Sequence, residues 1–381
     1  MPIDMIYLYY TDRFMGYNFG PEHPLKPIRL MLTYKLIEEC GMLDGNTCKV
    51  EPCFASEADL LRVHTPEYIA AVMAEVPDLA FGLGTSDTPV FKGIYDASRL
   101  LAGGSIDAAR RIISEDCKAF NIGGGLHHAM PTLASGFCVF NDPALAISVL
   151  KERFKSILYI DIDGHHGDGV QQIFYEDPDV LTISIHESGR YIFPGTGFID
   201  EIGAGPGLGY SVNIPMPMYA GDDEYRFAFE EIIPPIFEWF KPDVVVAQLG
   251  VDAHYLDPLT SLNLTLTGYN YLVSRIVELA NRYADGRLLA LGGGGYNLEV
   301  VPTAWAGVLH IMKDEPQPEY LPPYWVEFFM NYVDCEPLCP PDINIAIGNE
   351  TKKRINAELA ETLQGLKQKL SGVHKIFKIF N

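Results

Sequence analysis

Ten consecutive residues, 160–169, carry three carboxylates and two imidazoles. They follow residues 156–159, an apolar run that is typical of a buried parallel strand. Charged groups at the end of a buried strand are costly unless they are paired or bind a metal. Alternate residues of a strand share one face, so Asp161, Asp163 and His165 can point the same way. Because carboxylate and imidazole donors suit Zn²⁺ or another divalent transition metal, this segment indicates a metal site rather than a solvated loop with an N-cap aspartate.

We expect Asp163, His165 and Asp252 to be the metal ligands. Three protein ligands leave one position of a four-coordinate ion open for water or substrate, as a catalytic site requires. Such a metal lowers the pKa of a water molecule and polarises a carbonyl. Two acidic ligands cancel the formal charge of the ion, so we also expect neighbouring acid–base groups to assist it. His166 is expected to point to the opposite face of the strand, without a catalytic role.

Two adjacent histidines, His127 and His128, follow a glycine-rich turn. Adjacent histidines are poor core material, which favours an acid–base pair over two hydrogen-bonded loop histidines. Asp161 and Asp168 are left once the metal has its ligands. Each can accept a ring N–H from one of the two histidines, which would set its tautomer and basicity. A histidine would then take a proton from the metal-activated water and return one to the leaving group.

Tyr296 follows four glycines, residues 292–295. Glycines permit positive φ and a close approach of the backbone. Taken alone, the pattern fits a flexible turn with an exposed tyrosine equally well. Together with the other clusters it predicts a phenol directed at the oxyanion of an acyl-transfer reaction, in place of backbone N–H donors.

These clusters all follow predicted strands. Apolar, β-rich runs predict strands at residues 5–10, 119–122, 157–161, 180–186, 210–214, 244–250 and 288–291. Helical patterns lie between them, at residues 27–40, 95–114, 143–154, 222–240, 267–283 and 301–312. This alternation predicts an α/β fold with an open, mostly parallel sheet and helices on both faces. Ligands bind at the carboxyl ends of strands in such sheets, so the four polar clusters are expected to form one site.

The composition is that of one large globular protein. The chain has 381 residues, of which 48% are hydrophobic and 20% charged. Proline-rich stretches at residues 316–323 and 335–341 separate a predicted catalytic core, residues 1–315, from a C-terminal extension, residues 316–381. We expect this extension to pack on the core and to be helical over residues 350–376.

Charge and hydropathy limit the partners and the compartment. The net charge of −22 argues against a nucleic-acid surface. No stretch approaches the roughly 18 apolar residues that span a membrane, so no membrane partner is expected. Residues 1–4 lack the basic start of a signal peptide, and the seven scattered cysteines are expected to be buried free thiols. We therefore expect a cytoplasmic protein and leave its oligomeric state open.

At this point the motifs resemble the zinc-dependent histone deacetylase superfamily, and most of all its prokaryotic acetoin-utilisation-type members related to class I histone deacetylases. The resemblance covers most of residues 5–310. It rests on residues 124–129 (GGLHHA), 134–138 (ASGFC), 141–142 (ND), 161–168, 186, 193–197 (FPGTG), 252 and 294–296 (GGY). It implies a single arginase/deacetylase-like domain.

The resemblance also implies a role for each residue. Zn²⁺, or Fe²⁺ in the cell, would be bound by the three ligands expected above. His128 would be the general acid/base, His127 its electrostatic partner, and Asp161 and Asp168 their respective carboxylates, while Tyr296 would polarise the carbonyl. The implied substrate-binding residues are Asp87 at the rim, Gly136 through its backbone, Phe137 and Phe193 as tunnel walls, and Leu259. Structural K⁺ would be bound at one site by Asp161, Asp163, His165 and Ser184, and at a second by Phe174, Asp177, Val180 and Tyr210.

Two positions depart from the family pattern. Leu126 stands where many eukaryotic members have Trp, and Gly164 stands where they often have Leu. Neither change removes a catalytic group, but both leave the accepted acyl length open. We expect a metal-dependent deacetylase that hydrolyses the amide of N-acetylated or short-acyl lysine, or of a related amine. The alternatives are a deacetylase of small molecules such as acetylpolyamines, an arginase-like enzyme with two Mn²⁺ ions, and a non-catalytic acyl-lysine-binding regulatory protein.

Overall fold

One eight-stranded sheet organises the molecule. The computed structural model describes residues 5–343 and 345–376, so residues 1–4, on which the signal-peptide prediction rests, lie outside it. The strands are β1 (Ile6–Tyr9), β2 (Thr47–Val50), β3 (Lys118–Asn121), β4 (Ile157–Asp161), β5 (Val180–Glu187), β6 (Ser211–Met216), β7 (Val244–Gln248) and β8 (Leu288–Leu291). Their order is β2-β1-β3-β8-β7-β4-β5-β6, and all neighbours run parallel. The predicted α/β class is confirmed.

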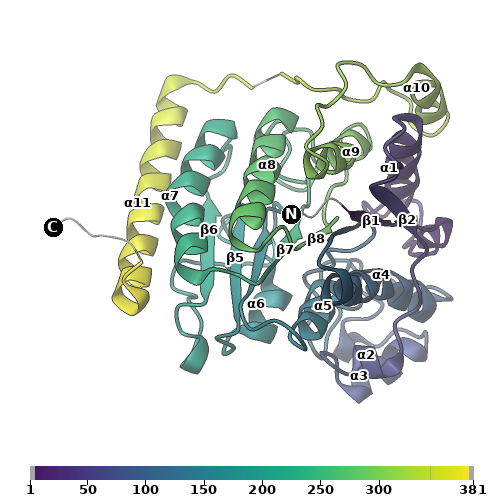
Figure 1. The fold of residues 1–381 in the computed structure, drawn as a ribbon, viewed down its shortest axis with the longest axis horizontal. Coiled ribbons are helices and arrows are strands. Elements are labelled where there is room, and N and C mark those ends of the chain that lie inside the picture. The colour runs from purple at the N-terminus through teal and green to yellow at the C-terminus, as the bar shows by residue number, and fades with distance from the viewer. Residues whose placement is uncertain (1–4, 344, 377–381) are drawn as a thin grey trace.

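Helices cover both faces of the sheet. They are α1 (Ile28–Glu39), α2 (Glu57–Leu60), α3 (Pro66–Met73), α4 (Ile94–Glu115), α5 (Asp142–Leu150), α6 (Asp168–Phe174), α7 (Asp222–Phe240), α8 (Leu266–Tyr283), α9 (Val301–Met312), α10 (Pro323–Met330) and α11 (Asn349–His374). Helices α11, α7, α8, α9 and α1 pack in a row on one side (Figure 1), while α4, α5 and α6 form the opposite layer. Three short 3₁₀ turns, Asp12–Gly16, Leu79–Phe81 and Gly205–Gly207, complete the assignment.

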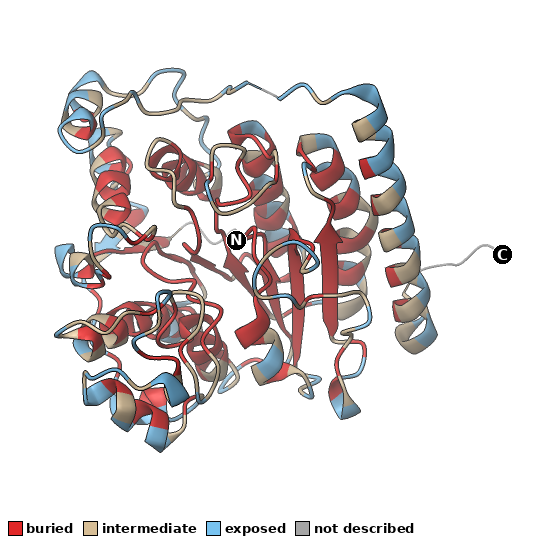
Figure 2. Ribbon diagram, turned by 180° about the vertical axis from the view of Figure 1, so that it is seen from behind, coloured by how far each residue is buried: buried red, intermediate tan, exposed pale blue. Residues whose placement is uncertain are grey.

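The core lies between these layers. Every residue of β4 and β5 is buried, and the central strands are buried along their length in Figure 2, while the helices expose mainly their outer faces. A strand covered on both faces needs apolar side chains at successive positions, which explains the continuous apolar runs of the sequence. Polar residues therefore gather where the strands end.

The predicted strands and helices are confirmed, with most ends within two residues of the prediction, but some elements were missed. Only one of the four residues of the edge strand β2 is buried, so its apolar signal is weak. Helix α6 begins at the charged segment itself, and α10 begins at a proline inside the stretch that we interpreted as a proline-rich spacer. Helix α5 ends at Leu150 rather than at residue 154. The seven thiols are free as predicted, but the prediction that they are buried holds only for Cys117 and Cys138, because four others are partly exposed and Cys53 is exposed.

The strand order explains how distant polar clusters meet. The four clusters follow β3, β8, β7 and β4, which are consecutive neighbours in the centre of the sheet. Their carboxyl ends therefore lie side by side, although they are separated by up to about 170 residues of sequence. Among the described residues, no helix is both long and apolar enough to cross a bilayer.

Candidate active site

Asp163, His165 and Asp252 form a buried group at the centre of this edge. Their potential ligand atoms lie within 4.8 Å of one another. His165 Nδ1 lies 2.8 Å from Asp252 Oδ2 and 3.4 Å from Asp163 Oδ1. The other carboxylate oxygen of Asp163 accepts hydrogen bonds from Gln248 Nε2 and from the backbone N–H of Gly294, both at 2.7 Å. These bonds hold one oxygen of Asp163 in place and leave the second directed at His165.

The donor set fits a divalent cation. Burial and the charge of Asp163 raise the pKa of Asp252, because two buried carboxylates lie beside each other. Burial lowers the pKa of His165, but the two carboxylates outweigh it and raise that pKa well above its usual value. An arrangement that attracts positive charge so strongly is stabilised by a metal ion, and two carboxylates with one imidazole suit Zn²⁺ or Fe²⁺.

Glycines bring the backbone against these ligands. A Cβ at Gly250 would collide with the Asp163 carboxylate, and a Cβ at Gly294 would lie 2.7 Å from Asp163 Oδ2 and would collide with Asp252. Any side chain at either position would displace one of these carboxylates. The glycine run before Tyr296 therefore serves close approach, as its composition predicts.

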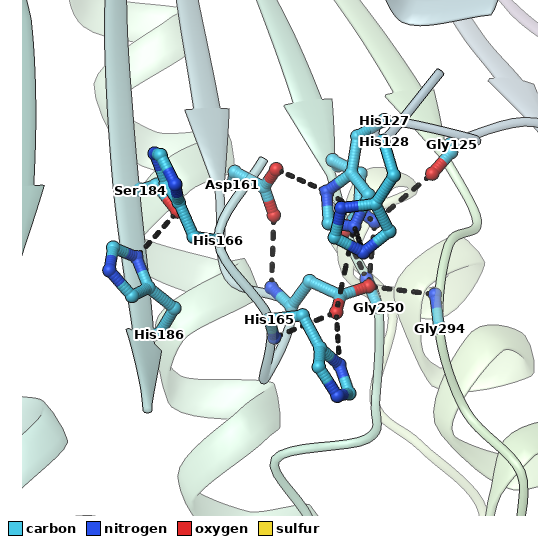
Figure 3. Close-up of polar contacts among 12 residues, drawn as sticks. Gly125, His127, His128, Asp161, His165, His166, Ser184, His186, Gly250 and Gly294 are labelled. Atoms are coloured by element: carbon cyan, nitrogen blue, oxygen red, sulfur yellow. Dashed lines mark hydrogen bonds and ion pairs between the residues drawn. The ribbon is translucent and has the colours of Figure 1, made fainter. Parts of the chain in front are cut away.

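The two histidines each face a different carboxylate. His127 Nδ1 lies 2.7 Å from Asp161 Oδ2 (Figure 3). His128 Nδ1 lies 2.7 Å from Asp168 Oδ1. Their Nε2 atoms are 3.0 Å apart, so one of these two nitrogens carries the shared proton. The four side chains are thus arranged as two carboxylate–histidine pairs that touch through the rings.

The pKa values of the two histidines are shifted in opposite directions. Burial lowers the pKa of His127, but the charges of Asp161 and Asp163 outweigh it and raise the value to about 9. Burial and the positive charge of His127 lower the pKa of His128 to about 4. His127 therefore donates the shared proton, and His128 is the neutral imidazole of the pair. This is the division of roles that a general base and its electrostatic partner require.

Residues at the start of α5 hold the loop that carries the two histidines. Asn141 caps this helix, and its side-chain amide donates to the carbonyls of His127 and Ala129 at 3.1 and 2.8 Å. Asp142 accepts from the backbone N–H groups of residues 125 and 126 at 3.0 and 2.7 Å. His64 Nε2 accepts the backbone N–H of Asn141, while its Nδ1 donates to the carbonyl of residue 130. Several buried hydrogen bonds therefore set the position of both rings.

Tyr296 is anchored through its backbone. Its N–H donates to Asp257 Oδ2 at 2.8 Å, and Asp257 Oδ1 accepts from the backbone N–H of Leu259 at 3.0 Å. One carboxylate therefore links the phenol-bearing loop to a second residue of the predicted substrate site. Burial, followed by the charges of Asp252 and Asp163, raises the pKa of the phenol well above 10, which keeps it a neutral donor.

A cavity of about 350 Å³ leads to these groups. Its lining residues are Asp87, His128, Gly136, Phe137, His165, Ile192, Phe193, Leu259 and Tyr296. All five residues expected to bind substrate are among them, while His127, His166 and the carboxylates Asp161 and Asp168 lie behind the lining. The cavity thus brings together His128, His165 and the Tyr296 phenol.

Aromatic rings form the walls of the cavity. Phe137 packs edge-on against Tyr296, with ring centroids 5.6 Å apart, and Phe193 packs edge-on against His128 at 4.9 Å. Phe137 has φ of +68°, a strained value for a residue with a side chain. The hydroxyl of Tyr17 donates to the Phe137 carbonyl at 2.6 Å and helps to hold it. The hydrogen bond from Tyr17 therefore helps to keep Phe137 in this unfavourable conformation.

The residues assigned to potassium lie in two places. Asp161 and Ser184 are register partners on β4 and β5, next to the metal group. The second set surrounds the turn between α6 and β5, where the backbone N–H of Asp177 donates to the Phe174 carbonyl at 3.0 Å. The Asp177 carboxylate is already paired with Lys151. Potassium at these positions stays a prediction.

Three residues at the site escaped the sequence analysis. Ile192 lines the cavity, and Asp257 holds two of its loops. The His23 ring packs edge-on against Phe137, with centroids 4.5 Å apart, and its Nε2 lies 3.2 Å from the carbonyl of Asp87. The only signals in the sequence are a histidine in a proline-rich turn and an aspartate before Pro258, and neither indicates its neighbour in space.

Comparisons with known proteins show the family and the fold of the chain. Residues 23–312 match the histone deacetylase domain family. The chain is 44% identical over 333 residues to the acetoin utilization protein AcuC of Bacillus subtilis (strain 168), covering 85% of this chain and 86% of that protein. It is 37% identical over 337 residues to AcuC of Staphylococcus xylosus, covering 86% and 87%. The crystal structure of an HDAC homolog from Aquifex aeolicus superposes with a TM-score of 0.82 at 31% identity, covering 93% of this chain and 99% of that one. An HDAC homolog complexed with SAHA gives a TM-score of 0.83 at 32% identity, with the same coverage.

Proposed function

Because the chain belongs to the histone deacetylase family, we propose that it is a metal-dependent deacetylase that hydrolyses the amide of an N-acetylated or short-acyl lysine, or of a related amine. The observation that carries the proposal is the meeting of His165, His128 and Tyr296 on one cavity with aromatic walls. The non-catalytic alternative is disfavoured because each group that the hydrolysis needs is present there.

Asp163, His165 and Asp252 would hold the metal, which we take to be Zn²⁺ or Fe²⁺. When bound, the ion supplies a Lewis acid that polarises the acyl carbonyl and lowers the pKa of the attacking water. The two carboxylates and the buried setting keep this charge in place at the inner end of the cavity. We also propose K⁺ as a structural ion at the two positions described above.

His128 would act as the general base. It is neutral, it lines the cavity, and its Nδ1 is bonded to Asp168. It would accept a proton from water at Nε2 once its hydrogen bond from His127 Nε2 gives way to that water, and Asp168 would stabilise the imidazolium that forms. His127, held positive by Asp161, keeps the pair from collecting a second proton before the substrate binds. The same proton would then pass to the departing amine.

Tyr296 would donate its phenolic proton to the oxygen of the tetrahedral intermediate. The raised pKa keeps this donor protonated, and the hydrogen bond from its N–H to Asp257 fixes the loop that carries it. A preorganised donor of this kind is among the largest contributions to acyl transfer.

The cavity walls suit the aliphatic part of an acyl-lysine side chain. Phe137 and Phe193 provide apolar surface, and Asp87 offers a carboxylate at the same opening. Neutral acylated amines can enter such a passage, whereas the charged product amine is less stable there and is favoured to leave.

The test is a substrate panel with the purified protein loaded with Zn²⁺ or Fe²⁺. Acetyl-, propionyl- and butyryl-lysine peptides and acetylated polyamines are incubated with it, and the released carboxylate is measured. We expect release of acetate from at least one acetylated amine, and loss of release after chelation. No release from any member of the panel, with metal bound, would overturn the proposal.

A further inference from the structure

Two buried histidines lie beside the catalytic group without taking part in it. His166 and His186 are 1% and 0% exposed, and their rings pack together with centroids 4.8 Å apart. Both point away from the metal group in Figure 3, and neither lines the cavity. The position of His166 agrees with the prediction that it faces away from the site. The mechanism leaves both rings without a role.

The partners of His166 determine its tautomer. Its Nε2 lies 3.2 Å from Gln171 Oε1, and the Gln171 amide nitrogen donates to Glu201 at 2.7 Å. Since Gln171 Oε1 can only accept, His166 Nε2 carries the hydrogen. His166 Nδ1 is therefore an acceptor, and its partner is the hydroxyl of Thr196 at 2.8 Å. Burial lowers the pKa of His166 to about 3, so the ring stays neutral in this arrangement.

His186 contacts the same loop. Its Nε2 donates to the carbonyl of Gly197 at 3.0 Å, and its Nδ1 accepts from the hydroxyl of Ser184 at 2.8 Å. Gly197 has φ of +84°, and a Cβ there would lie 2.7 Å from His166 Cγ and would collide with His186. The backbone of residues 196–197 therefore rests directly on the two rings.

Glu201 completes the attachment of this loop. Its Oε1 accepts the backbone N–H groups of Gly197 and Phe198, both at 3.0 Å. The polar groups of residues 196–198 are thus held by two neutral histidines and one carboxylate. Three residues earlier, the same loop presents Phe193, whose ring forms one wall of the cavity.

The opposite wall leaves little room for that ring to move. A Cβ at Gly136 would lie 2.9 Å from Phe193 Cε1 and would collide with the His128 ring. The passage between Gly136 and Phe193 is therefore set by where the loop holds its phenylalanine. A small outward shift would widen it for bulkier acyl groups and loosen the contact with a lysine side chain.

We propose that His166 and His186 are positioning residues that hold the Phe193 wall through Thr196 and Gly197, and so set the acyl selectivity of the cavity. The proposal deepens the proposed function and rests on it. It assigns no catalytic step to either histidine, since neither touches the substrate.

The experiment removes the hydroxyl of Thr196 without changing its shape. In Thr196→Val we expect KM for an acetyl-lysine peptide to rise about two- to tenfold, the range that the loss of one neutral hydrogen bond produces. kcat and metal content should change by less than about twofold, because no catalytic group moves. The ratio of kcat/KM for butyryl-lysine to kcat/KM for acetyl-lysine should rise at least about threefold. The affinity for SAHA, measured by calorimetry, should fall by a factor similar to the rise in KM.

Three further variants separate positioning from general disruption. Thr196→Ser keeps the hydroxyl and should restore the wild-type ratio. Thr303→Val removes another buried hydroxyl, which bonds the Val300 carbonyl at 2.9 Å on α9, and should leave the ratio unchanged. His166→Phe combined with Thr196→Val should shift the ratio no more than the larger single change, because both remove the same contact.

The possible results are distinct. If wild-type protein hydrolyses acyl-lysine but Thr196→Val has the selectivity of wild type, or Thr196→Ser behaves like Thr196→Val, this inference is wrong and the proposed function stands. If wild-type protein hydrolyses no acylated amine at all, the proposed function fails first.

Discussion

Removal of the Tyr296 hydroxyl should reduce the chemical step and little else. The phenol lines the cavity together with His165 and His128, and its backbone is fixed by Asp257. Tyr296→Phe keeps the ring against Phe137, so the wall and the loop remain in place. What disappears is one preorganised donor to the oxyanion.

The magnitude follows from that single loss. Removal of one oxyanion donor from a buried site costs about 100- to 1000-fold in kcat, or about 3–4 kcal/mol of transition-state stabilisation. Zinc content should stay near one per chain, because Tyr296 is not among the three grouped donors. KM should change by less than about threefold, since the hydroxyl contributes mainly after the carbonyl has been attacked.

The assay compares acetate release with a matched control. Tyr225 is also fully buried, and its hydroxyl has no hydrogen-bond partner in the part of the chain that the structure describes. Tyr225→Phe should therefore retain kcat within about twofold and should not destabilise the fold. A Tyr296→Phe variant that keeps its metal and more than about a third of the wild-type kcat would refute the role assigned to the phenol.

Three further predictions concern groups around the site and at the edge of the fold. Asp168→Asn should lower kcat by about 100-fold or more with KM little changed, because His128 loses the carboxylate that stabilises its protonated form. A pH–rate profile in which kcat reaches the same plateau as in wild type would contradict this. Burial lowers the pKa of His64 from 6.5 to about 4. The neutral ring therefore contributes about 3 kcal/mol to the free energy of unfolding above pH 6.5, and this contribution is lost as the pH falls toward 4. Urea unfolding of wild type and His64→Gln at pH 7 and pH 4.5 should show a smaller change in unfolding free energy with pH in the variant. An equal change in both proteins would exclude this role of His64. Changing Leu366, a fully buried residue of α11, to Ala should cost about 2–5 kcal/mol of unfolding free energy, whereas a loss under about 1 kcal/mol would mean that α11 is not firmly packed.

Most of the fold could be predicted because buried strands and amphipathic helices leave strong patterns. Helix α7 and strand β8 begin and end where the sequence predicts. The missed elements have different physical reasons: β2 is too exposed to leave an apolar run, and the first residues of α6 are polar or small because they serve the site. Helix α6 begins with Asp168 and Gly169, and the first of these is positioned for His128.

The site was predictable where chemistry limits the residue types. Few positions tolerate buried ionisable groups, so Asp163, His165 and Asp252 stand out from sequence alone. Contacts that depend on loop conformation do not stand out in this way. Nothing in the sequence places Asp257 beside the backbone of Tyr296, or Thr196 beside His166, because those contacts exist only after the loops have folded.

The central claim is that one divalent ion, held by Asp163, His165 and Asp252, supports deacylation at this cavity. A titration of metal-free protein with Zn²⁺, followed by acetate release from an acetyl-lysine peptide, tests it most directly. Activity should rise linearly and reach its plateau at one equivalent per chain, and Asp252→Asn should bind and respond weakly. A plateau only at two equivalents, as in a bridged pair of ions, or full activity without metal, would contradict the account.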